Sequence, residues 1–205
     1  MIQDAIFRST SQALHFAYLI QAYEVGAESV MSKVIRRMLE TLGIMDGTHE
    51  PSTVSFGGLS PLEIRGQCAL IRLSVETCLP PPEAWAIKAR YGITKIIERK
   101  GEPRAYAFAE YRISAMRSLA DYLAPSFPSV PRQAIMWLIA KSCGENPATR
   151  PSFRDIEELT GGSKSELHRV YPLVKERIRV LENLGTDRLT PIFAREGIVP
   201  ETEYA

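Results

Sequence analysis

Apolar residues recur three and four positions apart along most of this chain, and this spacing constrains the fold more than any other feature of the sequence. An α-helix turns once in about 3.6 residues, so residues at this spacing share one face and can be buried together. The pattern is clearest between residues 28 and 42, where the shared face consists of Met31, Val34, Ile35, Met38, Leu39 and Leu42. The alternation typical of a strand is weak at residues 93–97 and is not found elsewhere. The sequence therefore predicts an all-α protein.

Capping residues, prolines and glycines set the expected limits of the helices. Ser60 can cap a helix, Pro61 suits the first helical position and Glu63 completes a capping box, so a helix should begin there. The predicted helices span residues 9–23, 28–42, 60–78, 82–91, 104–123 and 132–143, and residues 44–58 are expected to form a loop. Two of these helices have an expected buried stripe, made of Leu62, Cys68, Leu70, Ile71 and Val75 in one and of Phe108, Tyr111, Ile113, Met116, Leu119 and Tyr122 in the other.

The proline-rich stretch PSFPSVP, residues 125–131, is the best candidate for a domain boundary. We therefore expect a helical domain over residues 1–124, a helix-turn-helix domain over residues 131–189 and a tail over residues 190–205. The tail contains the apolar pair Ile192 and Phe193, which could pack back on the protein or bind a partner. Ahead of the tail, an apolar stripe could form a homodimer seam, although a stripe this short more often closes a domain's own core; it consists of Val174, Ile178, Leu181 and Leu184.

Composition excludes several classes of protein. The chain has 205 residues, 45% of them hydrophobic and 24% charged, which is ordinary for a soluble globular protein and unlike a disordered one. The three cysteines are widely spaced and form no Cys-x-x-Cys pair, so we expect no structural zinc and a reducing, cytoplasmic location. The first residues do not resemble a signal peptide, and no apolar run reaches the roughly 18 residues that a membrane span needs.

Residues 152–172, SFRDIEELTGGSKSELHRVYP, look like two helices joined by a tight glycine turn. Ser152 with Asp155, and Ser163 with Glu166, have the spacing of capping boxes. Gly161 suits the left-handed position that follows many helices. The side chains expected to face inward are Ile156, Leu159, Leu167, Val170 and Val174.

Three residues depart from the usual pattern of such a pair of helices. Thr160 stands where a large apolar residue is usual, and Gly162 stands where a buried residue is usual inside the turn. Pro172 lacks a backbone donor and should crowd the carbonyl of His168, so the second helix is expected to kink or end near Tyr171.

The outward face of the second helix is polar and basic at its start. A helix whose first turns enter the major groove of DNA needs such side chains there, and we expect Lys164, Ser165, His168 and Arg169 to face the bases. Lys175 and Arg177 are expected to contact phosphates. A second basic patch in the middle of the chain could be a phosphate-contacting loop or simply a solvated charged face; it consists of Lys95, Arg99, Lys100 and Arg104.

Residues 132–141 (RQAIMWLIAK) and 152–169 (SFRDIEELTGGSKSELHR) together resemble the helix-turn-helix of sigma-factor C-terminal regions. They also resemble the C-terminal half of the late antitermination (Q-type) proteins of lambdoid phages and prophages, and residues 7–18 look like the start of related prophage proteins. The resemblance implies sequence-specific DNA binding near a promoter, with RNA polymerase as partner. Relatives with a cysteine-rich metal segment differ from this chain, which lacks one.

These observations favour a DNA-binding transcription regulator, of phage antiterminator type, that needs no cofactor and no metal. The alternative is a helical adaptor that docks on another protein without binding DNA. Catalysis is poorly supported, because the three histidines have no Cys or Ser partner arrangement around them and the glycine pair at residues 57–58 lies in no phosphate-binding motif. We therefore expect no catalytic residues.

Overall fold

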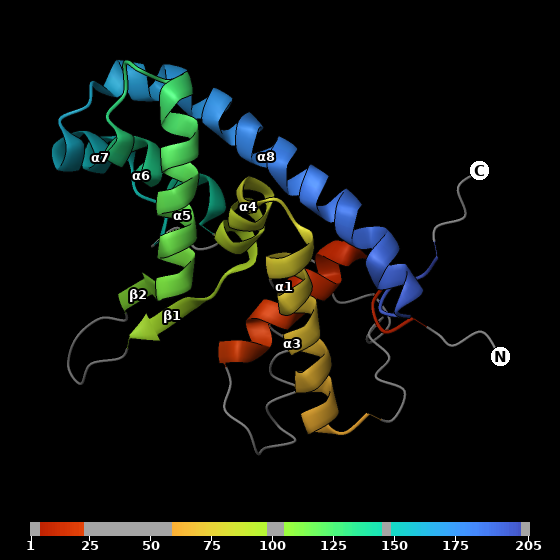
Figure 1. The fold of residues 1–205 in the computed structure, drawn as a ribbon. Coiled ribbons are helices and arrows are strands. Elements are labelled where there is room, and N and C mark those ends of the chain that lie inside the picture. Colours follow the sequence, from red (N-terminus) through yellow and green to blue (C-terminus); the bar gives the residue numbers. More distant parts are fainter. Residues whose placement is uncertain (1–4, 23–58, 98–104, 145–148, 202–205) are drawn as a thin grey trace, which may run out of the picture. The chain divides into compact units, whose positions relative to one another are not determined.

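The computed structural model describes residues 5–22, 59–97, 105–144 and 149–201 of the chain (Figure 1). Helices dominate these ranges, as the sequence predicts. The elements in chain order are α1 (Thr10–Leu19), the 3-10 turn η1 (Ile20–Ala22), α3 (Pro61–Cys78), α4 (Pro81–Tyr91), β1 (Thr94–Ile97), β2 (Ala105–Phe108), α5 (Glu110–Leu123), the 3-10 turn η2 (Ala124–Ser126), α6 (Arg132–Cys143), α7 (Phe153–Thr160) and α8 (Lys164–Arg195). The predicted helix at 28–42 and loop at 44–58 lie outside the described residues.

A short β-hairpin replaces the start of one predicted helix. Strands β1 and β2 pair antiparallel, with Thr94 opposite Phe108. The weak strand pattern at 93–97 is thus confirmed, whereas the helix predicted from residue 104 begins only at Glu110. Pairing with β1 satisfies the backbone of residues 105–108 and overrides their helical spacing. The prediction that Tyr122 faces inward is also wrong, because the buried stripe of α5 runs through Met116, Leu119 and Leu123 and leaves Tyr122 52% exposed.

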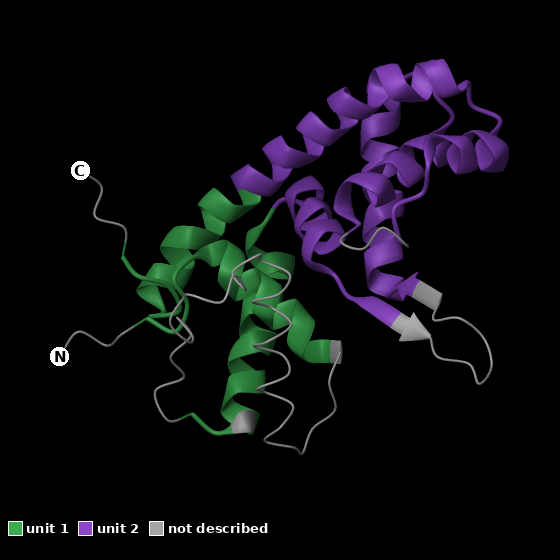
Figure 2. Cartoon of the chain, turned by 180° about the vertical axis from the view of Figure 1, so that it is seen from behind, with its two compact units in different colours: residues 1–79, 185–205 green, residues 80–184 purple. Residues whose placement is uncertain are grey.

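The chain divides into two compact units (Figure 2), one made of residues 1–79 and 185–205 and the other of residues 80–184. In the first unit, α1 packs against α3. The capping box at Ser60 and Glu63 forms as predicted. The buried stripe of α3 is Ile64, Cys68, Ile71 and Val75. Leu62 and Leu70, predicted to be buried, are 74% and 52% exposed, because they lie off this stripe on the solvent side of the helix.

The C-terminal residues belong to the same unit as the N-terminal helix. Phe193, Ile198 and Val199 are buried. The Phe7 amide donates to the Ile198 carbonyl at 2.9 Å, and the hydroxyls of Thr10 and Thr190 share a 2.8 Å hydrogen bond. Of the two alternatives for the tail, residues 192–199 therefore take the first and pack back on the protein.

The second unit has a single apolar core to which α4, α5, α6, α7 and the first part of α8 contribute. Residues on both sides of the segment 125–131 share this core, and Phe127 and Val130 within the segment are themselves buried. The segment predicted as a boundary thus lies inside this compact unit, whose limits differ from those of the predicted domains.

A buried arginine ties several elements of this unit together. Arg112 on α5 is fully buried. Its guanidinium donates to the carbonyls of Ala89 (2.9 Å) and Arg90 (3.3 Å) at the end of α4, and to the carbonyl of Cys143 (2.8 Å) at the end of α6. It also donates to the Thr94 hydroxyl on β1 at 2.9 Å. The last carbonyls of a helix have no intrahelical donor, so this one side chain caps two helices.

Candidate nucleic-acid interface

Helices α6, α7 and the start of α8 surround a common part of the core. Helix α6 has the predicted limits, and its Ile135 and Leu138 lie in the same buried cluster as Ile156 of α7 and Leu167 of α8. Three helices therefore follow one another here and share one apolar core, although the third is much longer than predicted. Val174 and Ile178, further along α8, are buried in this same cluster, so the unit's own core encloses them and they are not available for a dimer seam.

Helix α7 begins and ends as its sequence predicts. The Ser152 hydroxyl accepts from the Asp155 amide, and the Asp155 carboxylate accepts from the Ser152 amide, which completes the capping box. This pairing lowers the pKa of Asp155, chiefly through the bond from the Ser152 backbone. Gly161 follows with φ 69°, in the left-handed region that favours glycine.

The two unusual residues of the turn have a structural explanation. Thr160 folds its hydroxyl back to the Ile156 carbonyl at 2.6 Å. Gly162 is buried, and a Cβ there would lie 3.7 Å from side-chain atoms of both Leu167 and Pro131, an ordinary contact distance, so the turn is buried at this position without a side chain. Leu159, predicted to be buried, is 56% exposed, because the only fully buried position of α7 is Ile156 and Leu159 lies to one side of it on the helix.

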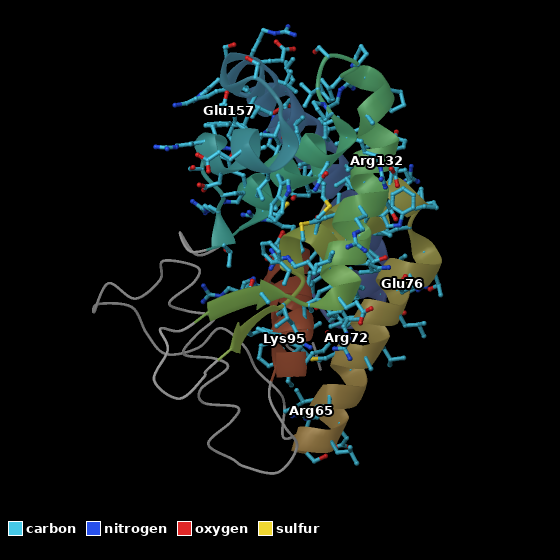
Figure 3. All side chains as sticks on the ribbon, turned by 90° about the vertical axis from the view of Figure 1, so that its left-hand side faces the viewer. Arg65, Arg72, Glu76, Lys95, Arg132 and Glu157 are labelled. Atoms are coloured by element: carbon cyan, nitrogen blue, oxygen red, sulfur yellow. The ribbon has the colours of Figure 1, made fainter. Side chains whose placement is uncertain are left out.

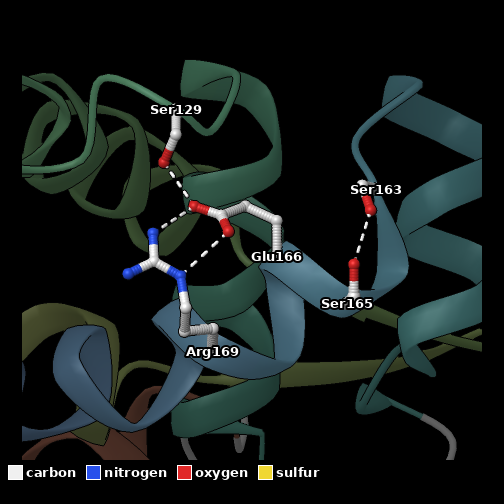
Figure 4. A network of polar contacts seen from close by, with 5 residues as sticks. All are labelled: Ser129, Ser163, Ser165, Glu166 and Arg169. Carbon is white, nitrogen blue, oxygen red and sulfur yellow. Dashed lines mark hydrogen bonds and ion pairs between the residues drawn. The ribbon is translucent and has the colours of Figure 1, made fainter.

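The capping box predicted for Ser163 and Glu166 does not form. Both oxygens of Glu166 accept hydrogen bonds from other partners, namely the Ser129 hydroxyl and the Arg169 guanidinium, the latter at 2.9 and 2.5 Å (Figure 4). A charged partner one turn along the helix attracts the carboxylate more strongly than a backbone amide. The Arg169 bond, followed by the Ser129 bond, lowers the pKa of Glu166 to about 2.

A carboxylate from the preceding helix occupies the start of α8 instead. Glu157 of α7 accepts from the Lys164 amide at 3.1 Å, and the Ser163 and Ser165 hydroxyls bond to each other at 2.9 Å. The first amides of a helix carry partial positive charge, so Glu157 partly neutralises the place where a phosphate would otherwise bind. These backbone amides are therefore less suited to an anion than those of an uncapped helix start.

All six predicted site residues of α8 are exposed, and they do not form one patch. Lys164, Ser165, His168 and Arg169 lie on the first two turns, opposite the buried residues. At about 100° per residue, Lys175 and Arg177 are roughly 200° apart around the helix axis and project to different sides. Of the second basic patch, Lys95 is exposed on β1, and Arg99, Lys100 and Arg104 lie outside the described residues.

An aromatic cluster that the sequence did not reveal positions His168. The rings of His168 and Phe153, the first residue of α7, stack with centroids 3.9 Å apart. Tyr171 meets the Phe153 ring edge-on at 5.5 Å. Lys141, at the end of α6, places its Nζ 4.6 Å from the centroid of that ring and donates to the Pro151 carbonyl at 2.9 Å. The only hint in the sequence is an aromatic residue directly after the Ser152 cap.

Of the two outcomes predicted for Pro172, a kink or an end near Tyr171, the end is wrong, because α8 is one 32-residue helix that runs from Lys164 to Arg195. Pro172 is exposed, whereas Val170, Val174 and Ile178 are buried on the opposite side. The hydrogen bond that proline removes therefore faces solvent, where water can satisfy the free carbonyl, and burial of the apolar stripe holds the helix together.

The surroundings of the site carry both signs of charge. Arg154 and Glu158 on α7 form an exposed pair at 2.9 Å, and Glu166 holds Arg169. Within the described ranges no three His, Cys, Asp or Glu side chains are grouped as a metal site would need, and no helix is long and apolar enough to cross a membrane. No protein-family model matches this sequence, and no curated protein matches it.

Proposed function

We propose that this protein binds DNA through the first two turns of α8 and acts in the cytoplasm as a transcription regulator, of antiterminator type, together with RNA polymerase. The observation that carries the proposal is the exposed set Lys164, Ser165, His168 and Arg169 on a helix start that packs against α6 and α7. Arginine and lysine can donate to guanine edges in the major groove, and serine can pair with any base. No step requires a cofactor or a catalytic residue.

DNA binding requires Arg169 to exchange partners. Its guanidinium is paired with Glu166 but is itself 66% exposed, and an ion pair open to solvent contributes little to stability. A guanine base or a phosphate group offers two acceptor atoms to the Arg169 guanidinium, in an interface that contains less water. His168 needs no such exchange, because its stack on Phe153 already fixes the ring.

The test is a binding titration on DNA selected from a random pool, at two salt concentrations. Lys164→Ala and Arg169→Ala should each weaken binding to the selected sequence by roughly tenfold or more, and weaken binding to random DNA much less. Arg179→Ala is the matched control, because Arg179 pairs with Glu176 at the same spacing, three residues apart on the same helix. Equal affinities for all variants on the selected DNA would exclude α8 as the reading helix.

A second candidate, a helical adaptor without DNA binding, is favoured by a different observation. Leu159 and Leu173 are 56% and 52% exposed around the same helix start, and the nearby charges are mixed. Exposed leucines near a mixed-charge surface are typical of a protein contact. The test measures whether the chain captures purified RNA polymerase. The adaptor would be favoured if the chain binds no DNA, if Lys164→Ala and Arg169→Ala still capture the polymerase, and if Leu159→Ser with Leu173→Ser does not.

A further inference from the structure

A groove between α5 and α6 carries polar groups that the proposed DNA contact does not use. It encloses about 360 Å³ and is lined by Arg117, Ala120, Arg132, Gln133, Met136 and Trp137. Figure 3 labels Arg132, the first residue of α6, on this side of the unit. The groove is therefore a cavity with two guanidiniums, an amide and an indole around a short apolar floor.

The guanidinium of Arg117 is available to a ligand. It is exposed and makes no hydrogen bond or ion pair within the part of the chain that the structure describes. Arg132, by contrast, presents its fork to both carboxylate oxygens of Asp121, one of them at 2.7 Å. That pair is open to solvent, with 59% of the Arg132 side chain and 53% of the Asp121 side chain exposed. An oxyanion can thus displace or share this partner at little cost.

The indole of Trp137 adds a donor that lacks an acceptor. Its Nε1 is shielded from water and has no hydrogen-bond partner among the described residues. Buried donors without partners are rare in proteins. The indole N–H only donates, as does each guanidinium, so three of the four polar side chains in the groove are donors only, and two of them, Arg117 and Trp137, have no acceptor among the described residues. Trp137 is half-buried and lines the groove, so a ligand there would lie against this side chain.

The groove lies close in the chain to the candidate interface. Ser129, three residues before Arg132, donates its hydroxyl to Glu166 on the first turn of α8 (Figure 4). The same carboxylate holds Arg169. The hydrogen bond between Ser129 and Glu166 thus joins the first two turns of α8 to the segment that leads into Arg132, a residue of the groove.

We propose that this groove binds a backbone phosphate of the same DNA that α8 contacts. This inference rests on the proposed function, and it assigns a role to Arg117, Arg132 and Trp137 that the base-contacting face does not include. A phosphate presents several acceptor oxygens and matches the arginine fork, as the Asp121 carboxylate already does. An acidic peptide would offer the same charge, but the Ser129–Glu166 hydrogen bond links the segment just ahead of the groove to a helix start whose exposed side chains suit nucleic acid.

The test measures how the affinity for selected DNA depends on salt concentration in the full-length chain. Each neutralised phosphate contributes about 0.9 to the slope of log affinity against log salt. Because the groove holds one phosphate, Arg117→Ala with Arg132→Ala should lower the slope by about one, and Arg117→Ala alone should lower it by less. Sequence preference should remain. Arg195→Ala, an exposed arginine in the last turn of α8, is the control and should leave the slope unchanged. Far-ultraviolet circular dichroism checks that each variant is folded.

A second readout follows Trp137 directly. In a Trp85→Phe background, in which Trp137 is the only tryptophan, selected DNA should change its emission, and Arg117→Ala should move that change to higher DNA concentration. Wild-type DNA binding with an unchanged salt slope in both arginine variants would overturn the groove proposal and leave the α8 contact standing. If the wild type binds no DNA, both proposals fail. Emission that responds to an Asp/Glu-rich peptide and not to DNA would assign the groove to a protein partner instead.

Discussion

Arg112 shows how a single side chain can donate hydrogen bonds to the last carbonyls of two helices. A lysine at this position would bring a charge but no fork, so it could not reach the carbonyls of α4 and α6 and the Thr94 hydroxyl at once. Burial without full pairing is costly for both the charge and the carbonyls. The position therefore requires arginine specifically.

We predict that Arg112→Met lowers the free energy of unfolding by about 3 kcal/mol or more, because it leaves several buried carbonyls without a donor. Urea denaturation followed by circular dichroism measures this. Arg117→Met on the same helix is the control, and its exposed side chain should cost less than about 0.5 kcal/mol. Similar stabilities of the two variants would contradict the capping role.

Glu182 should make stability depend on pH. Burial raises the pKa of this carboxyl from 4.5 to about 7, and the Arg90 guanidinium opposes the rise. The folded state thus binds the proton more tightly than the unfolded chain, so the stabilisation is complete below pH 4.5 and is lost as the pH rises through 7. Glu182→Gln should remove this loss and be more stable than the wild type at pH 8, by about 3 kcal/mol.

Thermal unfolding at pH 5 and pH 8 tests this prediction. The difference between Glu182→Gln and wild type should grow from the lower pH to the higher one. Glu176→Gln is the control, because an arginine lowers the pKa of Glu176, so this group stays ionised throughout that range. A pH-independent difference for Glu182→Gln would show that Glu182 has an ordinary pKa.

At the scale of the element, the turn between α7 and α8 uses its two glycines differently. Gly161 has a left-handed backbone, whereas Gly162 has ordinary backbone angles and ordinary contact distances around the place of a Cβ. Gly161→Ala should therefore lose about 1 kcal/mol of stability, and Gly162→Ala should change it by less than about 0.5 kcal/mol. Chemical denaturation of both variants measures this. A larger loss for Gly162→Ala would mean that the packing there is tighter than the contacts indicate.

Glu166 should restrain DNA binding through its hold on Arg169. Glu166→Gln keeps the size of the side chain but removes the charge, so Arg169 becomes available and a negative charge leaves the interface. We expect the affinity for DNA to rise by roughly threefold or more at low salt and by less at high salt. Glu176→Gln, which frees Arg179 in the same way, should give a smaller rise because it lies nearly three turns further along α8. An unchanged affinity would mean that Arg169 takes no part in binding.

Local sequence signals predicted helix limits well where a cap or a proline acts within one turn. The capping boxes at Ser60 and Ser152 and the left-handed Gly161 are of this kind. The predictions were wrong where a residue outside the local segment determines the structure. Glu166 bonds to Ser129 and Arg169 and so does not form the predicted capping box with Ser163. Pairing with β1 places residues 105–108 in a strand. The outward face of α8 followed from helical periodicity, whereas the Phe153 stack depends on how α7 meets α8. Periodicity alone does not provide that information.

At the scale of the whole molecule, the two units differ in how the chain supplies them. Residues 80–184 form their unit without interruption, and one buried cluster lies entirely inside this range. We predict that a fragment of residues 80–184 unfolds cooperatively in urea, because it retains that core. A fragment of residues 1–79 is the control, and it should not, because it lacks the buried Phe193, Ile198 and Val199. Gradual, non-cooperative unfolding of the 80–184 fragment would contradict the assignment of an independent core.

The hydrogen bond from the Phe7 amide to the Ile198 carbonyl affects the order in which the two units can fold during translation. Its two partners are separated by most of the chain, so Phe7 emerges long before the C-terminal residue that it bonds to. Helix α3 can pack on α1 as soon as it is translated, and the unit of residues 80–184 can assemble once its last turn leaves the exit tunnel. The first unit is completed only when residues 193–199 have been translated, so we expect it to finish folding last.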